Sequence, residues 1–284
     1  MTRGRIALAL ASAPLLIAAS TAAAAPGIGL RSIRLVDHTR VARFRTGAVE
    51  PRTLTTVVRY PLTGRGPFPL VVFAHGFALS PQVYGPLLDA WTRAGFVVAA
   101  PVFPVESPGA PGGPSESDLV NEPADIHFVI TRLLAGPLRK LIDPRRIAVA
   151  GQSDGGVAAL GAAFDPRLRD PRVDAALILS GAQPAGERLD YAHAHVALLA
   201  MQGSADTINA PANTRAFFAL ARRPKFLLWL LGGEHLRPYS TDRRYLTVVE
   251  RASIAFLDRY LRRDGLGPLL AAAVPGVARL TAAP

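Results

Sequence analysis

A single serine stands in a sequence context that is typical of a catalytic nucleophile. Ser153 lies in the stretch Gly-Gln-Ser-Asp-Gly-Gly at 151–156, between an apolar run at 146–150 and a segment of small residues at 157–164. A strand, a sharp turn and a helix in this order form a nucleophile elbow, and the glycines leave room where strand and helix pass close together. We therefore expect Ser153 to attack a carbonyl carbon, and the N–H of Asp154, at the start of the helix, to face the resulting oxyanion.

A carboxylate and a histidine follow in the chain order serine, acid, histidine that goes with this elbow. Asp206 comes after the apolar run 196–200, and His235 lies in a glycine-rich loop after the run 226–231. A carboxylate that accepts the Nδ1–H of a histidine fixes its tautomer and stabilises the imidazolium that forms during attack. We expect His235 to take the proton from Ser153 and Asp206 to orient His235. The alternative for Asp206 is a cap of the turn before the next helix.

Three rival acids and four further histidines occupy positions where a structural role is favoured. Each lies at the start of a strand, in an edge strand, in a polar loop, inside a helix or beside His235. These residues are Asp174, Asp190, Glu234, His38, His127, His193 and His195. The chain has no cysteine, which excludes a thiolate nucleophile, disulfides and thiolate metal sites. We expect neither a metal nor a cofactor.

The loop after the apolar run 67–74 contains a second candidate for oxyanion binding. It consists of His75, Gly76 and Phe77. In proteins with such an elbow, this loop provides the second N–H donor to the oxyanion, and a glycine lets its backbone approach the nucleophile. We therefore expect the N–H of Phe77 to be that donor. His75 precedes the nucleophile in the chain and is expected to brace the loop rather than to act as the base. The side chains of Phe77 and Gln152 are expected to contact the substrate.

Two roles are open for the side chain of Asp154. In the first turn of a helix a carboxylate is stabilised by the positive end of the helix dipole, by about 0.3–1 kcal/mol. Alternatively, this carboxylate lies at the edge of the groove for the acyl chain and makes it unfavourable to long apolar or anionic acyl groups.

Hydrophobic patterning predicts the elements that must position these residues. Residues 28–62 alternate apolar and polar side chains, which indicates two antiparallel edge strands. Continuous apolar runs, typical of strands buried on both faces, follow at 67–74, 96–100, 147–150, 175–179, 196–200 and 226–231. Helices are expected between most of these runs, at 81–94, 125–135, 157–164, 211–221 and 241–262. Strands that alternate with helices predict an α/β fold, with a mostly parallel, doubly wound sheet and right-handed crossovers.

No repeat or linker divides the chain, so residues 26–284 are expected to form a single domain. The apolar tail after Gly265 is expected to pack against the sheet, with a frayed terminus as the alternative. Residues 180–194 are too few to form a helical cap over the site, so we expect an open cleft. The loop 103–118, rich in proline and glycine, forms either one wall of that cleft or an ordinary surface loop.

The first 25 residues have the pattern of a secretory signal peptide. Arg3 and Arg5 form a basic start, an apolar segment follows at 6–19, and small residues complete the segment. The apolar segment is shorter than the roughly 20 residues that a spanning helix needs. We expect cleavage and a secreted protein, extracellular or associated with the cell envelope, without a stable membrane anchor. The alternative is a retained anchor.

Composition and charge indicate a globular protein with a basic surface. Of the 284 residues, 50% are hydrophobic and 19% are charged, which is sufficient for a sizeable core. The net charge of +11 comes from scattered arginines rather than from one basic cluster. This distribution favours a soluble surface with affinity for an acidic cell envelope, and we expect no binding of nucleic acid.

The order Ser153, Asp206 and His235, together with the loop 75–77, resembles the secreted bacterial serine esterases of the α/β-hydrolase superfamily. Within it, the chain is most similar to the group of chlorophyllases, platelet-activating-factor acetylhydrolases and bacterial cutinase-type polyesterases. The resemblance implies an α/β-hydrolase fold without a large cap domain. It also implies that the protein hydrolyses carboxylic esters, small or lipid-like, through an acyl-enzyme and without a cofactor.

Three features depart from the polyester-degrading members of that group. Asp154 stands where they have methionine, their substrate-stacking tryptophan has no counterpart near 180–184, and the disulfide of many cutinases cannot form. Phe77 does match the aromatic residue of their oxyanion loop. Polyester hydrolysis is therefore permitted and not indicated. The alternatives are a serine peptidase or amidase on the same fold, and a catalytically silent protein that binds the cell envelope.

Overall fold

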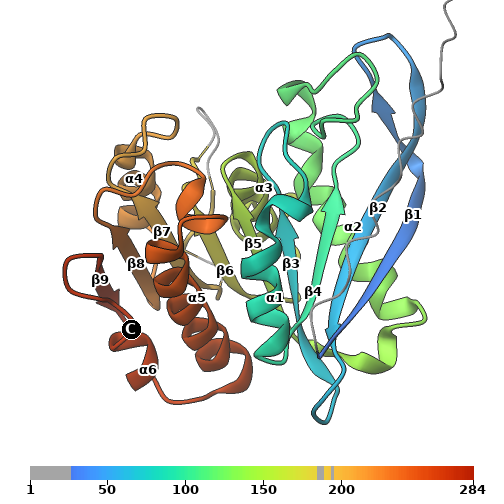
Figure 1. Ribbon diagram of the computed structural model, residues 1–284. Helices are drawn as coiled ribbons and strands as arrows, with labels where there is room; N and C mark the ends of the chain where they lie inside the picture. The colour runs from blue at the N-terminus through green and yellow to red at the C-terminus, as the bar shows by residue number, and fades with distance from the viewer. Residues whose placement is uncertain (1–26, 184–188, 193–194) are drawn as a thin grey trace, which may run out of the picture.

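The computed structural model describes residues 27–183, 189–192 and 195–284 (Figure 1). The predicted signal segment, 1–25, lies outside the described residues. Within the described part of the chain, no helix is both long and apolar enough to cross a membrane.

One mixed sheet forms the centre of the molecule (Figure 1). In the described residues it has nine strands in the order β1-β2-β4-β3-β5-β6-β7-β8-β9. The strands from β3 to β8 run parallel, whereas β1, β2 and β9 are antiparallel to their neighbours. The strands are β1 (Ile28–Arg43), β2 (Val49–Pro61), β3 (Phe68–Ala74), β4 (Val97–Val102), β5 (Ile142–Gln152), β6 (Val173–Leu179), β7 (Ala197–Gly203), β8 (Lys225–Leu230) and β9 (Ala278–Ala283).

Helices cover both faces of this sheet (Figure 1). Side chains of α2 (Glu122–Ala135), α3 (Asp154–Phe164) and α4 (Pro211–Leu220) join one hydrophobic core, and those of α1 (Gly85–Arg93), α5 (Arg243–Leu257) and α6 (Gly267–Leu270) join the other. The short helices are η1 (Pro81–Tyr84), η2 (Glu116–Asn121), η3 (Arg139–Leu141), η4 (Arg237–Tyr239) and η5 (Asp258–Arg262).

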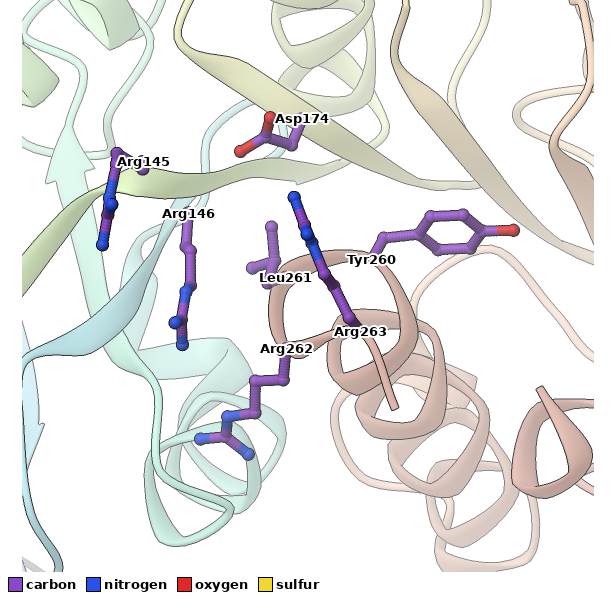
Figure 2. A pocket seen from close by; sticks show the side chains of 7 residues that line it. All are labelled: Arg145, Arg146, Asp174, Tyr260, Leu261, Arg262 and Arg263. Atoms are coloured by element: carbon purple, nitrogen blue, oxygen red, sulfur yellow. The ribbon is translucent and has the colours of Figure 1, made fainter. Parts of the chain in front are cut away.

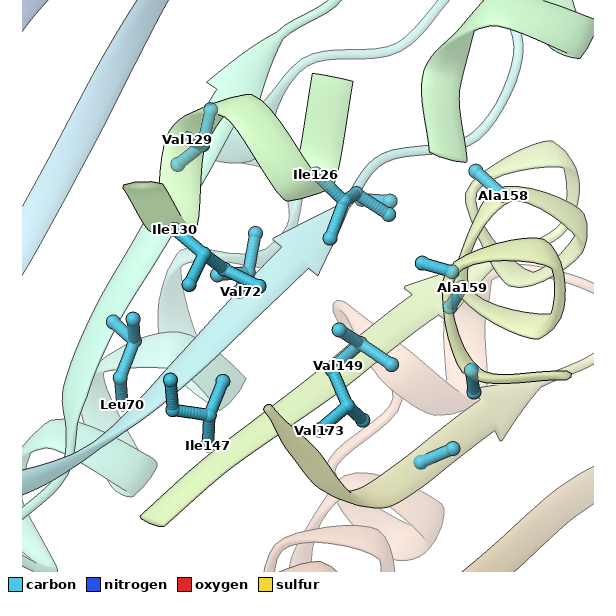
Figure 3. Packing of buried hydrophobic residues seen from close by; sticks show 14 of the residues in the cluster. Leu70, Val72, Ile126, Val129, Ile130, Ile147, Val149, Ala158, Ala159 and Val173 are labelled. Atoms are coloured by element: carbon cyan, nitrogen blue, oxygen red, sulfur yellow. The ribbon is translucent and has the colours of Figure 1, made fainter. Parts of the chain in front are cut away.

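The continuous apolar runs of the central strands are explained by this two-sided covering. Leu70 and Val72 of β3 pack with Ile126 and Ile130 of α2 (Figure 3), whereas Val71 and Phe73 join the core on the opposite face. Successive side chains of a strand point to opposite faces, so every position must be apolar when both faces are buried. The predicted α/β class and the mostly parallel sheet are therefore confirmed.

Both ends of the described chain add antiparallel strands to the sheet. β1 and β2 are the two strands predicted from the alternating pattern, and β2 joins β4. At the other end, the tail after Gly265 packs against the sheet, as predicted, and also adds β9 beside β8. The sequence did not predict this strand, because its alanine-rich pattern lacks a clear alternation.

Two predicted helices are divided in the structure. The segment 81–94 forms the 3₁₀ turn η1 followed by α1, and 241–262 forms α5 followed by the π-helical turn η5. Helix α2 starts at Glu122, three residues before its predicted start, with Pro123 in its first turn. Proline fits that position because the first turn of a helix has no internal acceptor for its N–H.

Candidate active site

The serine elbow has the geometry that its glycines predict. Ser153 joins β5 to α3 with φ of 56°, a left-handed conformation that is rare for a residue with a side chain. A Cβ atom at Gly151 would collide with the carbonyl oxygen of Gly155, and one at Gly155 would collide with that of Ala74. Only glycine therefore permits the close contact of strand and helix that places the serine at the apex.

Three side chains from separate loops meet at the carboxyl edge of the sheet. Nε2 of His235 lies 2.9 Å from Oγ of Ser153, and its Nδ1 lies 2.9 Å from Oδ2 of Asp206. A carboxylate can only accept, so Nδ1 carries the proton and Nε2 is free to accept the hydroxyl proton of Ser153. The structure thus brings together the serine, histidine and aspartate selected from the sequence, in a hydrogen-bonded chain.

The carboxylate of Asp206 is buried and fully hydrogen-bonded. Its Oδ2 also accepts from Nε2 of Gln202 at 3.0 Å, while its Oδ1 accepts the N–H groups of Ile208 and Asn209 at 3.0 and 2.9 Å. Burial opposes ionisation, but the hydrogen bond from His235 and those from the backbone outweigh it and lower the pKa of Asp206. One oxygen orients the histidine and the other caps the turn, so both roles considered from the sequence are present in one residue.

His75 has the bracing role that the sequence predicted. Its ring is completely buried, with Nδ1 at 2.9 Å from the carbonyl oxygen of Gly76 and Nε2 accepting the N–H of Phe103 at 3.1 Å. Nδ1 must therefore hold the proton. Burial lowers the pKa of His75 to about 4, so the ring stays neutral and ties the loop after β3 to the loop after β4.

Two backbone N–H groups are available beside the serine. Within the described residues, no protein acceptor takes the N–H of Phe77, and the N–H of Asp154 lies in the first turn of α3, where a helix offers no acceptor. A Cβ at Gly76 would lie 2.8 Å from Oε1 of Gln152 and 3.2 Å from Cβ of Ser153. Gly76 therefore allows the loop to pass close to the nucleophile, as expected.

Gln152, which is expected to contact the substrate, also has a structural role beside Ser153. Its side chain is completely buried, with Oε1 accepting from the hydroxyl of Tyr84 at 2.7 Å. Its Nε2 donates to the carbonyl oxygen of His235 at 3.0 Å and lies 3.2 Å from Nε2 of the same ring. The amide nitrogen must face this carbonyl, which can only accept. Gln152 thus holds the histidine loop, and its polar atoms are already engaged within the protein.

A cavity of about 400 Å³ opens over the serine. Its walls combine apolar side chains with two carboxylates, and its lining residues are Phe77, Leu79, Glu116, Gln152, Ser153, Asp154, Ile208, Asn209, His235 and Leu236. Glu116 belongs to the loop 103–118, so this loop forms one wall of the cleft. No helical cap lies over the site in the described residues between β6 and β7.

The side chain of Asp154 faces this cavity from the start of α3. Its Oδ2 is buried and has no hydrogen-bond partner. Burial raises the pKa of this carboxyl, and the neighbouring charge of Glu116 raises it further. The carboxyl therefore lies at the edge of the cleft as well as at the helix terminus, so both roles expected for Asp154 are compatible with its position.

Another cavity, of about 330 Å³, lies near the start of β5 and β6, away from the serine (Figure 2). Arg145, Arg146 and Arg263 line it together with Asp174, whose Oδ2 accepts the N–H of Ile147 at 3.2 Å. Asp174 is thus at the amino edge of the parallel strands and cannot reach a histidine at the carboxyl edge. This placement removes the main rival for the role of Asp206.

Sequence reasoning missed the buried partners that hold the site residues. Gln202 donates to Asp206, and its Oε1 accepts from Thr214 at 2.6 Å. Tyr84 donates to Gln152 and accepts the N–H of Gly76 at 3.2 Å. An isolated glutamine or tyrosine has no sequence signature of such a role, because its partners are set by the fold. In the described residues, no group of three or more histidines and acids is arranged to hold a metal ion.

The sheet, the elbow and the chain order of the site define the class of this protein as an α/β-hydrolase. A family model described as chlorophyllase matches residues 34–180, and the chain belongs to this family. The match includes Phe77, Ser153 and Asp154 and ends before Asp206 and His235. Membership indicates a carboxylic ester hydrolase. No match was found among the curated proteins.

Proposed function

We propose that this protein is a secreted serine carboxylesterase that cleaves small or lipid-like esters through an acyl-enzyme. The hydrogen-bonded chain from Asp206 through His235 to Ser153 is the observation on which the proposal rests. The family supports ester hydrolysis, and the composition of the first 25 residues supports export.

In the first step, Oγ of Ser153 attacks the carbonyl carbon of the ester while its proton moves to Nε2 of His235. Asp206 stabilises the imidazolium, since its carboxylate accepts the Nδ1–H and has a lowered pKa. The negative charge on the former carbonyl oxygen is held by the N–H groups of Phe77 and Asp154. Loss of one such donor typically costs a factor of about 10²–10³ in turnover.

The tetrahedral intermediate then collapses. The bond to the alcohol oxygen breaks, that oxygen takes the proton from Nε2 of His235, and an acyl-serine remains. A water molecule attacks the acyl carbon while giving its proton to the same nitrogen, and the second collapse returns this proton to Ser153. The acid is released and no metal or redox group takes part in either step.

A panel of nitrophenyl esters and peptide anilides tests the proposal. A carboxylesterase should hydrolyse the esters and leave the anilides uncleaved, because an amine leaving group needs more complete protonation than a phenolate. Faster cleavage of the anilides would identify a peptidase or amidase instead. A fluorophosphonate probe should label the wild type and fail to label Ser153→Ala. Absence of labelling in the wild type would indicate a catalytically silent protein.

A further inference from the structure

Two glutamates lie next to each other in the interior, close to the active site. Glu106 belongs to the loop after β4, and Glu122 is the first residue of α2. Both side chains are completely buried, and their carboxyl groups are within hydrogen-bonding reach of each other. None of their four oxygens receives a hydrogen bond from a donor elsewhere in the described residues. Unpartnered carboxylates at this depth would cost several kcal/mol each, so the groups cannot be two separate anions.

The groups that face this pair are mostly acidic. Negative charge comes from η2, α2 and α3, on Glu116, Asp118, Asp125 and Asp154. Two arginines pair with these acids. Arg52 of β2 is completely buried and forms ion pairs with Asp118 at 2.7 Å and Asp125 at 2.5 Å. Arg40 of β1 is engaged with Asp125 at 2.9 Å and with Asp37 at 2.7 Å. Neither arginine contacts the glutamate pair.

Protonation of the two glutamates removes the cost of burying two unpartnered charges side by side. Two adjacent buried carboxyls cannot both ionise, whereas a protonated carboxyl donates one hydrogen bond to its neighbour. Burial raises the pKa of Glu106 to about 8 against the opposing effect of the hydrogen bond with Glu122, and the surrounding acids add to the rise. Burial also raises the pKa of Glu122 well above its ordinary value. The pair therefore keeps its protons at neutral pH and ionises in the alkaline range.

The pair is connected to the oxyanion loop through the backbone. The carbonyl oxygen of Glu106 accepts the N–H of Ala78 at 3.0 Å, and Ala78 has φ of 53° directly after Phe77. A second hydrogen bond, from the N–H of Phe103 to His75, also joins the loop after β4 to the oxyanion loop. Glu122 belongs to α2, which packs against α3, the helix that starts at the serine. The glutamate pair thus links the loop that contains Phe77 to the helical layer behind the nucleophile.

We propose that Glu106 and Glu122 form a protonated carboxyl pair that positions the oxyanion loop, and that ionisation of this pair lowers turnover at alkaline pH. The proposal rests on the esterase function and on the role of Phe77 in it. Charge on the pair opposes Asp154, Glu116 and the partner glutamate. The strained backbone at Ala78 then loses its support, and the N–H of Phe77 moves from the position that the oxyanion needs.

The pH dependence of kcat for a nitrophenyl ester tests the positioning role. In the wild type we expect kcat to fall at least threefold between about pH 7.5 and 9.5. The double variant Glu106→Gln/Glu122→Gln retains neutral side chains of the same shape and leaves no carboxyl in the pair to ionise, so it should keep most of the activity at pH 7 and remove the alkaline fall. The KM should change little, since an oxyanion donor acts mainly in the transition state.

Glu250→Gln is the matched control. Glu250 is a partly buried glutamate in α5, on the opposite face of the sheet, and burial also raises its pKa. Its substitution should leave the alkaline fall in place. An alkaline fall that persists in the double variant, or that disappears equally in Glu250→Gln, would overturn the positioning role.

Thermal unfolding measured from pH 5 to pH 9 tests the pair without relying on catalysis. Unfolded glutamate ionises near its ordinary pKa of 4.5, while the folded pair keeps its protons to about pH 8. Stability should therefore fall across this window, and less so in Glu122→Gln than in the wild type. Equal pH dependence in the two proteins would overturn the protonated pair itself. Absence of ester hydrolysis in the wild type, with the unfolding difference present, would instead reject the esterase function and the positioning role together.

Discussion

Replacement of Asp206 by asparagine should disable the enzyme through the tautomer of His235. Two backbone N–H groups, from Ile208 and Asn209, point at Oδ1 of Asp206, so the amide oxygen of the variant must take that place. The amide nitrogen then takes the place of Oδ2, where it faces Nδ1 of His235. A donor at this position makes Nδ1 the acceptor and moves the ring proton to Nε2. The ring can then no longer accept a proton from Ser153.

Reversal of the amide would turn its nitrogen toward the two backbone N–H groups of Ile208 and Asn209, which cannot change their polarity. In the expected orientation the amide nitrogen faces one further donor, Nε2 of Gln202, whose amide is held by Thr214 and by the carbonyl oxygen of Gly203 at 3.1 Å, so the variant loses this hydrogen bond as well. We therefore expect kcat of Asp206→Asn to fall by a factor of about 10⁴, the scale seen when a triad aspartate is changed in this way. This factor corresponds to about 5 kcal/mol of transition-state stabilisation. The assay is kcat for a nitrophenyl ester at pH 8, with thermal unfolding measured in parallel.

Asp165→Asn provides the matched control for this experiment. Asp165 is also a buried aspartate that accepts a backbone N–H, from Arg167 at 2.7 Å, but it follows the end of α3 that is distant from Ser153. It should keep wild-type kcat. A loss below about tenfold in Asp206→Asn, or a similar loss in Asp165→Asn, would refute the assignment of Asp206 as the orienting acid.

The remaining predictions concern three other residues. Ser153→Ala should lower ester turnover by several orders of magnitude with nearly unchanged thermal unfolding, and more than about a tenth of the activity remaining would identify a different nucleophile. His75 has a pKa of about 4 in the folded protein and an ordinary value of 6.5 in the unfolded chain. Between these pH values the unfolded chain therefore binds a proton that the folded protein does not. The free energy of unfolding, measured by denaturant titration, should therefore fall by up to about 3 kcal/mol between pH 6.5 and pH 4. An equal dependence of this free energy on pH in the wild type and in His75→Gln would contradict this. Asp154→Met should raise kcat/KM for longer acyl esters relative to acetate, because each buried methylene then recovers up to about 0.8 kcal/mol. An unchanged chain-length preference would leave Asp154 as a helix-terminus residue alone.

Local patterns in the sequence were sufficient for most of the fold. The runs at 67–74 and 147–150 are apolar at every position because helices cover both faces of their strands, and this is visible without any contact information. The division of 81–94 and 241–262 into an α-helix and a short 3₁₀ or π turn was not predicted. Over a few residues such a turn has nearly the same spacing of apolar side chains as an α-helix. Strand β9 was missed for a related reason: its pairing with β8, rather than its own sequence, makes it a strand.

The sequence by itself determined which residues have the chemistry of a hydrolase and at which edge of the sheet they lie. The close approach of strand and helix at Ser153 requires glycines, and these are visible in the sequence. Residues that follow parallel strands lie at the carboxyl edge of the sheet, where Asp206 and His235 are found. Both arguments use only neighbours in the chain or the direction of a strand.

Only the tertiary structure decided how these residues are supported. The partners are far apart in the chain, as in Tyr84 with Gln152 or Glu106 with Glu122, and their contacts depend on strand register and on the path of the loop after β4. A glutamine that holds a histidine and a glutamate that keeps its proton have the same sequence signature as exposed residues of their type. Burial and the absence of a compensating charge distinguish them, and both are properties of the folded protein.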